Sequence, residues 1–294
     1  MHHKLTQPHE RTKKTNILNT KLKTPLTLQV PILGSLLLAF LCTLLIMNSQ
    51  IGSFQVTPFT DESNPLGPFG NALYFVILVA TGATVLYILL KRKNRRLITI
   101  LIGFALSLAV FTLSLIYSLI ILLQFTVSFA EILALTIAIT LTAIADYAIF
   151  FNKAKLSGIT LLTIGGSLGA FLAFTIPIRS AIAILILLAV YDTFAVYRGP
   201  VGKIASHGLE QLRGLTFQFK DIQIGLGDLT FYSMLVSSML MNFGPVSSIA
   251  SIIGILIGSF LSFRLLEKRG IFPGLPIPIA LGLAIGFLAS FLQS

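Results

Sequence analysis

Long apolar runs separated by short polar segments make up most of the chain from Pro31 onward. Several of these runs exceed the ~18 residues that indicate a membrane-spanning helix. Nine spans can be placed, at about residues 31–47, 71–90, 97–123, 131–151, 159–177, 181–197, 224–241, 246–265 and from 272 to the C-terminus. We therefore predict an all-α polytopic membrane protein with nine transmembrane helices.

Polar segments divide this layout into four parts. Residues 1–26 form a basic tail, which we expect to be disordered and cytoplasmic. Spans one to six occupy residues 27–198, and a polar cytoplasmic loop follows at residues 199–223. Spans seven to nine occupy residues 224–294. Between spans one and two, the acids and turn formers from Asp61 to Pro68 are typical of an exposed external loop.

The composition agrees with a membrane protein and disfavours a soluble one. Of the 294 residues, 55% are hydrophobic and 11% charged, whereas a soluble domain carries about 25% charged residues. The net charge of +11 would suggest nucleic acid as a partner of a soluble protein, but here the basic residues lie between apolar runs. We expect a lipid bilayer and no nucleic acid.

The basic residues also predict an orientation. With the N-terminus in the cytoplasm, the nine spans place all of the 21 lysines and arginines except Arg179 on the cytoplasmic side. A missed or extra span would scramble this distribution. We predict a multi-pass protein of the cell membrane, with its N-terminus inside and its C-terminus outside.

Two residue types exclude several chemistries. The single cysteine, Cys42, rules out an internal disulfide. The four histidines all lie outside the apolar runs, at His2, His3, His9 and His207. This argues against a HExxH zinc site and against a serine–histidine protease within the membrane. We expect neither a metal nor an organic cofactor.

Pairs of glycines four residues apart recur in three of the predicted spans. Such spacing lets helices approach closely in a membrane, and we interpret the pairs as packing contacts. They are Gly165 and Gly169, Gly254 and Gly258, and Gly282 and Gly286.

Three of the ten acids lie within apolar runs, namely Asp146, Asp192 and Asp228. A carboxylate in a span costs about 2.5 to 3.5 kcal/mol and usually faces the interior of a helix bundle. Asp192 comes six residues before Arg198, and Asp228 eight residues after Lys220. At 1.5 Å per residue they lie about 9 Å and at most about 12 Å from the cytoplasmic end. Because spans six and seven run antiparallel, the two carboxylates reach nearly the same level.

Two facing carboxylates in a low-dielectric site share a proton and titrate as a coupled pair. The ionised member can activate water while the protonated member polarises a carbonyl group, which is general acid/base catalysis. On spacing and depth alone an alternative stays open, in which each aspartate pairs with a neighbouring polar group or marks an ion path. Asp146, near the cytoplasmic side, either pairs with Lys153 or lines a hydrated cavity, or else tunes the pair as a third acid.

At these residues the sequence resembles the presenilin and signal peptide peptidase family of GxGD intramembrane aspartyl proteases, as a prokaryotic or archaeal presenilin-like member. That family carries Tyr-Asp in its sixth span, Gly-Leu-Gly-Asp in its seventh and Pro-Ala-Leu-Pro at the start of its ninth. The corresponding motifs here, in the same order, are Tyr191-Asp192, Gly225-Leu226-Gly227-Asp228 and Pro273-Gly274-Leu275-Pro276. The resemblance covers the whole nine-span layout, including the polar break between spans six and seven.

The resemblance implies that Asp192 and Asp228 are the catalytic pair and that Leu275 with its flanking prolines shapes the active site. The prolines at 273, 276 and 278 prevent a regular helix start and leave main-chain groups unpaired, so an unwound substrate could pair with them as an added strand. Gly274 stands where the family has alanine; it keeps close backbone approach possible, so we expect the role to survive. Tyr191 would pack or hydrogen-bond beside the pair, or simply be an interior aromatic residue.

The function implied is an aspartic-type intramembrane endopeptidase that hydrolyses peptide bonds in transmembrane segments of membrane proteins. The predicted orientation is that of presenilin, so substrates would be single spans with their N-terminus outside. The composition suggests a single chain that is active without the extra subunits of γ-secretase. The polar loop is short beside that of eukaryotic presenilins, and autocleavage there is not assumed.

Three alternatives remain at this stage. A prepilin-peptidase-like GxGD enzyme shares the aspartyl chemistry, but the proline-rich start of span nine argues against it. A transporter or channel could use the three intramembrane aspartates as a proton or cation relay, although no inverted repeat is visible. A pseudo-enzyme could bind and chaperone membrane segments.

Overall fold

The computed structural model describes residues 29–49, 52, 55–92, 94–125, 127–150, 154–198, 216–219, 222–269 and 271–292. The predicted basic tail at residues 1–26 lies outside these residues, as does most of the predicted cytoplasmic loop at 199–223.

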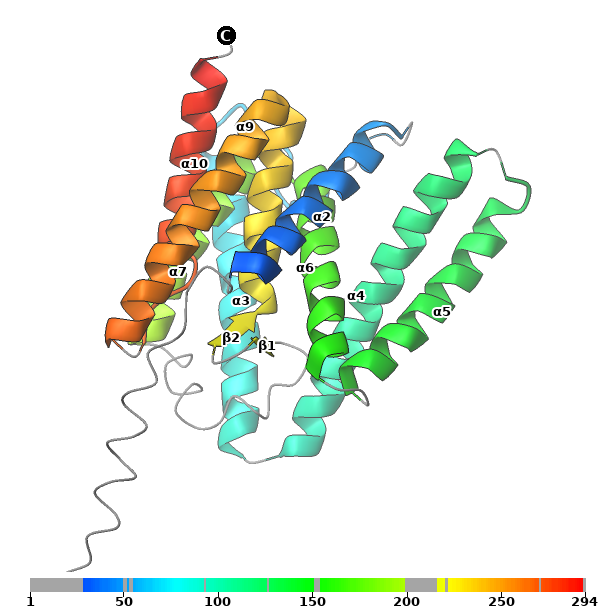
Figure 1. The fold of residues 1–294 in the computed structure, drawn as a ribbon, viewed down its shortest axis with the longest axis horizontal. Coiled ribbons are helices and arrows are strands. Elements are labelled where there is room, and N and C mark those ends of the chain that lie inside the picture. Colours follow the sequence, from blue (N-terminus) through cyan, green and yellow to red (C-terminus); the bar gives the residue numbers. More distant parts are fainter. Residues whose placement is uncertain are drawn as a thin grey trace, which may run out of the picture.

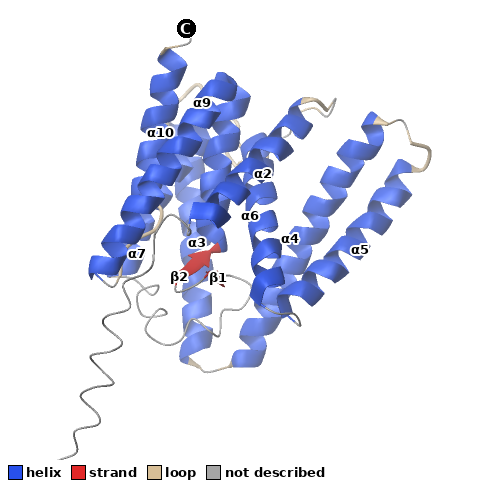
Figure 2. Cartoon of the chain, in the orientation of Figure 1, coloured by secondary structure: helices blue, strands red, loops and turns tan. Residues whose placement is uncertain are grey.

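Apolar helices form nearly all of the described chain (Figures 1 and 2). Within the described residues, seven of them are long and apolar enough to cross a membrane. In chain order these are α2 (Gln29–Met47), α3 (Leu66–Lys91), α4 (Arg95–Gln124), α5 (Ala130–Phe150), α6 (Ala154–Thr175), α7 (Ile178–Tyr197) and α9 (Leu226–Arg269). The shorter α10 (Pro276–Phe291) follows them. The prediction of an all-helical membrane protein is confirmed at this level.

Helix α9 is two helical segments joined at a break. A straight helix of its 44 residues would be about 66 Å long, twice the ~30 Å of a bilayer's hydrocarbon core. Gly244 interrupts it with φ 87° and ψ 178°, a backbone conformation that favours glycine, and Pro245 follows. Ser248 in the second segment donates a hydrogen bond of 2.8 Å to the carbonyl of Val236 in the first. The two segments therefore lie side by side, as the yellow and orange halves of α9 show in Figure 1.

A small β-hairpin precedes α9 and corrects the sequence-based prediction. Strands β1 (Thr216–Phe219) and β2 (Ile222–Gly225) pair antiparallel, with Phe219 opposite Ile222 and Thr216 opposite Gly225. The seventh span was predicted to begin at Ile224, whereas the helix begins at Leu226. Apolar and polar residues alternate in Thr-Phe-Gln-Phe and Ile-Gln-Ile, which is the strand period. The strands are too short for this signal to stand out beside long apolar runs.

Helix α9 lies against α2, α6 and α10, and glycines permit its closest contacts. A methyl group built on Gly165 of α6 would lie 2.8 Å from Cβ of Leu229, and one on Gly258 of α9 would lie 2.5 Å from Cα of Pro278. Gly282 of α10 likewise faces Leu235 at 2.8 Å. Larger residues would push these helices apart, so the packing interpretation of the glycine pairs is confirmed.

The loop predicted to be exposed, from Asp61 to Pro68, is exposed over most of its length, but its last two residues are buried. Asp61 and Ser63 are indeed exposed, and the Ser63 hydroxyl and amide donate to Asp61, which holds the pKa of that carboxyl below its ordinary value. Gly67 and Pro68, however, are buried in the first turn of α3, which begins at Leu66 rather than near Asn71 as predicted.

Asn71 binds the segment before α3 to the helix bundle. Its side chain is fully buried and exchanges two hydrogen bonds with the backbone of Phe59, at 2.9 and 2.8 Å. It also donates to the hydroxyl of Ser180 at the start of α7, at 2.8 Å. The Asn71 side chain thus satisfies the backbone N–H and carbonyl of Phe59, which would otherwise bind water.

Candidate active site

Three elements far apart in sequence meet at one place in the bundle. Asp192 lies on α7, Asp228 lies in the first turn of α9, and the irregular segment 271–275 leads into α10. Pro276 is the first residue of α10, a position that proline favours, so the residues before it lie outside the helix and their N–H groups have no partner within it. The main-chain groups of this segment are therefore free to bind side chains of other helices. The predicted ninth span began at Phe272, four residues before the helix starts.

Asp192 binds this loop directly. The backbone N–H of Leu275 donates a hydrogen bond of 3.0 Å to Oδ2 of Asp192. A carboxylate that accepts from a backbone amide makes a bond about twice as strong as one between neutral groups. The bond fixes the Asp192 carboxyl of α7 to the start of α10. Backbone groups within the two helices cannot make such a link, because they bind each other.

Asp228 lies on the other side of the same loop. A methyl group built on Gly274 would lie 2.8 Å from its Oδ2 and 3.2 Å from its Cγ. One built on Gly225 would lie 3.5 Å from the same oxygen, an ordinary contact distance. The Asp228 carboxyl is therefore enclosed between two glycines, and it interacts electrostatically with Asp192. The two aspartates thus converge on neighbouring residues of one loop.

Tyr232 completes this arrangement and was missed by the sequence analysis. It lies one turn after Asp228 on α9, and its hydroxyl donates a hydrogen bond of 2.7 Å to the carbonyl of Gly274. A residue four positions after a functional aspartate shares its helix face, and this spacing is the signal that could have found it.

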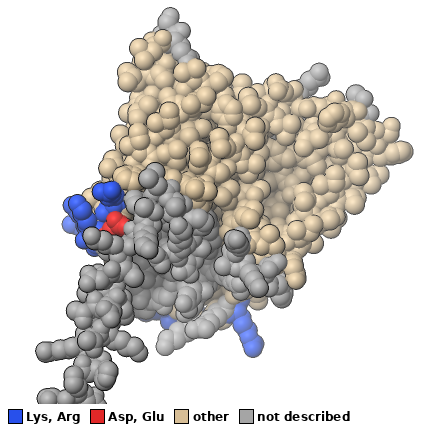
Figure 3. Space-filling model, viewed as in Figure 1, with Lys and Arg blue, Asp and Glu red and all other residues tan. Residues whose placement is uncertain are grey.

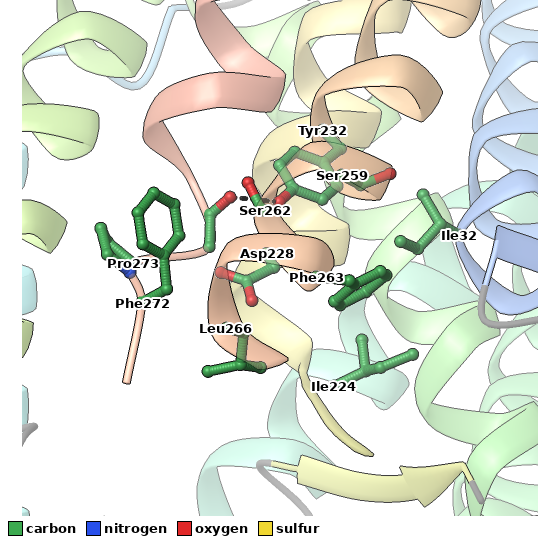
Figure 4. Close-up of a pocket in the computed structure, with 11 residues that line it drawn as sticks. Ile32, Ile224, Asp228, Tyr232, Ser259, Ser262, Phe263, Leu266, Phe272 and Pro273 are labelled. Atoms are coloured by element: carbon green, nitrogen blue, oxygen red, sulfur yellow. Dashed lines mark hydrogen bonds between the residues drawn. The ribbon is translucent and has the colours of Figure 1, made fainter. Parts of the chain in front are cut away.

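A cavity of about 110 Å³ opens beside Asp228 (Figure 4). Apolar residues of α2, β2, α9 and the loop wall it, and Asp228, Tyr232, Ser259 and Ser262 supply polar groups. The Ser262 hydroxyl is buried and has no hydrogen-bond partner among the described residues. The cavity is roomy and polar enough to hold several water molecules, each needing about 10–15 Å³ and two to four partners.

The remaining predicted site residues lie around this centre. Tyr191 is partly exposed on α7 beside Asp192, and Pro273 lines the cavity. Leu226 and Leu275 are buried. Gly227 is exposed, and a methyl group built there would come no closer than 3.9 Å to a neighbour. Space for another chain therefore exists at Gly227, whereas Gly274 is already covered by Asp228.

Asp146 has a different environment from the other two aspartates. On α5, its Oδ2 accepts a hydrogen bond of 2.7 Å from the Ser107 hydroxyl of α4. The predicted alternative partner, Lys153, lies outside the described residues.

Within the described part of the chain, no group of three or more His, Cys, Asp or Glu side chains is placed to hold a metal ion.

The comparisons with known proteins agree with these motifs. The sequence profile of the family described as signal-peptide peptidase, presenilin aspartyl protease matches residues 33–208, and the presenilin profile matches residues 203–294. Presenilin-B of Dictyostelium discoideum is 32% identical over 128 residues, which is 39% of this chain. The match spans only 26% of that relative's length.

Solved structures show the same fold. A presenilin family intramembrane aspartate protease crystallised in space group P2 has a TM-score of 0.65 at 22% identity, over 92% of this chain and 99% of that one. Its C222 form has a TM-score of 0.64 at 19% identity, over 91% and 98%. With a family profile matching more than half of its length, the chain belongs to the signal-peptide peptidase and presenilin aspartyl protease family.

Proposed function

We propose that the protein is an intramembrane aspartyl endopeptidase in which Asp192 and Asp228 are the general acid/base pair. The observation that carries this proposal is the convergence of both carboxyl groups on the Gly274-Leu275 segment, from α7 and from α9. Acids that served only to join helices would not need a third, irregular element between them.

The chemistry follows from two carboxyl groups that share one proton. The ionised carboxylate takes a proton from water as the water oxygen attacks the carbonyl carbon of the scissile peptide bond. The protonated partner donates its proton to the carbonyl oxygen, which gives a tetrahedral intermediate. The first carboxyl then donates the proton it took from water to the amide nitrogen, and the C–N bond breaks as the partner takes a proton back from a hydroxyl of the intermediate, which restores the pair. The cavity beside Asp228 is suited to supply the water that each cycle consumes.

Substrates are transmembrane segments of other proteins, and their backbone must be unwound where it is cut. Strand β2 ends at Gly225, three residues before Asp228, and among the described residues β1 and β2 pair only with each other, so each has one edge without a partner there. An unwound substrate could add to such an edge as a further strand. Its other side would face the main chain of the loop at 271–275.

The nine-span topology with a cytoplasmic N-terminus belongs to this proposal. Support comes from the break in α9, which gives two helical segments where two spans were predicted. The basic side chains visible in Figure 3 gather at the lower end of the molecule, and Figure 1 marks the C-terminus at the opposite end. We further propose that the protein lies in the cell membrane, uses no cofactor, and cleaves spans whose N-terminus is outside.

The test is cleavage of a single-span reporter by the purified protein in liposomes. Wild type would be compared with Asp192→Ala, Asp228→Ala and Asp146→Ala, and proton and cation flux would be followed in the same vesicles. We expect cleavage by wild type and Asp146→Ala, and none by the other two. Flux without cleavage, lost in all three variants, would instead establish a transporter.

A further inference from the structure

We infer that Tyr232 is a positioning residue for the aspartate pair, acting on Asp192 through the single peptide unit that joins Gly274 to Leu275. This inference rests on the proposed protease function. The Tyr232 hydroxyl donates to the Gly274 carbonyl at 2.7 Å, and the Leu275 N–H donates to Asp192 at 3.0 Å. The carbonyl and the N–H are the two ends of one amide group. Asp192 on α7 and Tyr232 on α9 are thus bound to opposite ends of a single planar unit.

The first consequence concerns the strength of the bond to Asp192. Donation to an amide oxygen draws electron density through the conjugated C–N bond and makes the N–H a better donor. Linked hydrogen bonds of this kind strengthen one another by perhaps 10–30% per bond. The Tyr232 hydroxyl therefore strengthens the interaction that holds the Asp192 carboxylate, although it does not touch that carboxylate.

The second consequence concerns the orientation of the peptide unit. Gly274 has no side chain, so its ψ can change at little steric cost and the peptide plane that follows it can tilt. Such a tilt would turn the Leu275 N–H away from the Asp192 carboxylate, whereas a full half-turn is already opposed by Leu275, because it would move the φ of that residue from −76° into the positive region. The Tyr232 hydroxyl opposes the tilt because it holds the carbonyl on the side of α9. A glycine beside the pair makes such a lock necessary.

Tyr232 is itself held rigidly enough for this task. Its side chain is only 3% exposed, and it lines the cavity beside Asp228 (Figure 4). It follows Asp228 by one helical turn, so a displacement of either residue would move the other. The titratable groups that interact electrostatically with this pair are Tyr191 on α7 and Tyr232 on α9. The loop at 271–275 contributes no titratable side chain.

The chain provides a matched control for the test. Tyr117 on α4 also donates its hydroxyl to a backbone carbonyl, that of Ser167, at 2.8 Å. Tyr117→Phe therefore removes the same kind of bond from a place where neither aspartate is involved. We expect Tyr232→Phe to lower kcat about 10-fold with KM within 2-fold of wild type, whereas Tyr117→Phe leaves both within 2-fold. Equal kinetics of the two variants would overturn the inference.

A spectroscopic measurement tests the same bond without relying on activity. Labelling with ¹³C-carbonyl glycine and ¹⁵N-leucine selects the five Gly-Leu peptides of the chain, and a Leu275→Val variant identifies the signal of Gly274-Leu275. We expect the Leu275 amide proton to resonate downfield in wild type and to move upfield in both Asp192→Asn and Tyr232→Phe. In Tyr117→Phe it should not move.

The two arms separate the possible failures. If wild type cleaves no reporter but the amide signal responds to both substitutions, the proposed function fails and the hydrogen-bonded chain stands. If wild type cleaves reporters but the signal ignores Tyr232→Phe, the inference about Tyr232 is wrong. A thermal unfolding midpoint for each variant shows that Tyr232→Phe is folded before either result is used.

Discussion

Two regions of the bundle contain an aspartate inside an apolar helix, and they differ in what reaches the carboxyl group. Around Asp192 and Asp228, two helices and an irregular loop converge beside a cavity. Around Asp146, the contact is a serine of the adjacent helix, whose single hydroxyl proton is shared between Asp146 and the carbonyl of Gly103 on its own helix. An aspartate in a membrane span thus indicates a reactive site when backbone N–H donors and a cavity lie next to its carboxyl group. When a single hydroxyl group is its partner, the aspartate indicates a contact between helices.

The difference has a structural cause. Helices α4 and α5 form a regular antiparallel pair at the right-hand edge of Figure 1, and their backbone groups are satisfied within each helix. Such a pair offers a carboxyl only side-chain partners. At the start of α10, by contrast, the first N–H groups have no partner within the helix, and this leaves the Leu275 N–H free to donate a hydrogen bond to Asp192.

The largest effect on cleavage should come from replacing either Asp192 or Asp228, which tests whether this region is the reactive one. Asp192→Asn or Asp228→Asn should lower kcat/KM by about 10³-fold or more, because a neutral amide can neither accept nor supply the transferred proton. The double variant should lose no more than either single variant, since the two residues act as one unit. Losses that multiply in the double variant would contradict a shared mechanism.

A smaller effect is expected from Gly274→Ala. The added methyl would lie 2.8 Å from Oδ2 of Asp228, so the carboxyl must rotate away. A short flexible side chain can do this at little cost in stability, but displacing a reacting group lowers the rate. We expect kcat to fall about 10-fold while the unfolding midpoint stays within ~2 °C of wild type.

Gly34→Ala is the control for this substitution. Its methyl would meet only side-chain atoms of Leu162, at 3.5 Å. It should leave cleavage unchanged. If Gly274→Ala is as active as Gly34→Ala, the Asp228 carboxyl can move away from the added methyl without loss of rate. The alanine of the related motif would then be equivalent to glycine here.

By hydrophobic pattern and depth alone the two regions look alike, and this sets a limit on what those signals can predict. The hydrophobic runs correctly predicted a bundle of apolar helices, and the gap between the predicted spans at 224–241 and 246–265 coincides with the break in α9 at Gly244. Depth along a helix could also be counted, and it placed Asp192 and Asp228 at one level. It placed Asp146 near the same side of the membrane, because counting residues does not say what faces each carboxyl group.

The missed features all depend on contacts between distant parts of the chain. In the sequence, nothing distinguishes Tyr232 from the other six tyrosines; only the fold places its hydroxyl next to the Gly274 carbonyl. Asn71 was taken as the edge of a span, yet it is the residue that binds the backbone of Phe59. Neither partner could be identified from local pattern, since each pair is joined only by the packing of whole helices.

An intermediate effect is expected when the cavity beside Asp228 is filled. Ser262→Leu replaces a buried hydroxyl, which has no partner among the described residues, with apolar volume. The fold should tolerate this, because an unsatisfied buried hydroxyl is destabilising by about 1–3 kcal/mol. We expect kcat to fall about 3-fold, because the added side chain excludes water from the cavity beside Asp228.

Ser262→Ala removes the same hydroxyl without filling the space, so it separates the two causes. It should cleave more rapidly than Ser262→Leu and unfold at a similar or higher temperature than wild type. If the two variants cleave at the same rate, the cavity volume has no part in catalysis. The hydroxyl itself would then be the group that matters.

The smallest effect on cleavage, and a clear one on stability, should come from the contact between Ser107 and Asp146. Ser107→Ala leaves the partly buried carboxyl without its 2.7 Å partner and should lower the free energy of unfolding by about 1 kcal/mol. The double variant Ser107→Ala/Asp146→Leu removes both polar groups and should recover most of that loss, because two apolar groups replace a partly buried polar pair. Cleavage should stay within 2-fold of wild type in both, measured on protein that unfolding curves show to be folded. If cleavage is lost in a folded double variant, Asp146 acts with the other two aspartates, and its contact with Ser107 holds a third acid in place for the reaction.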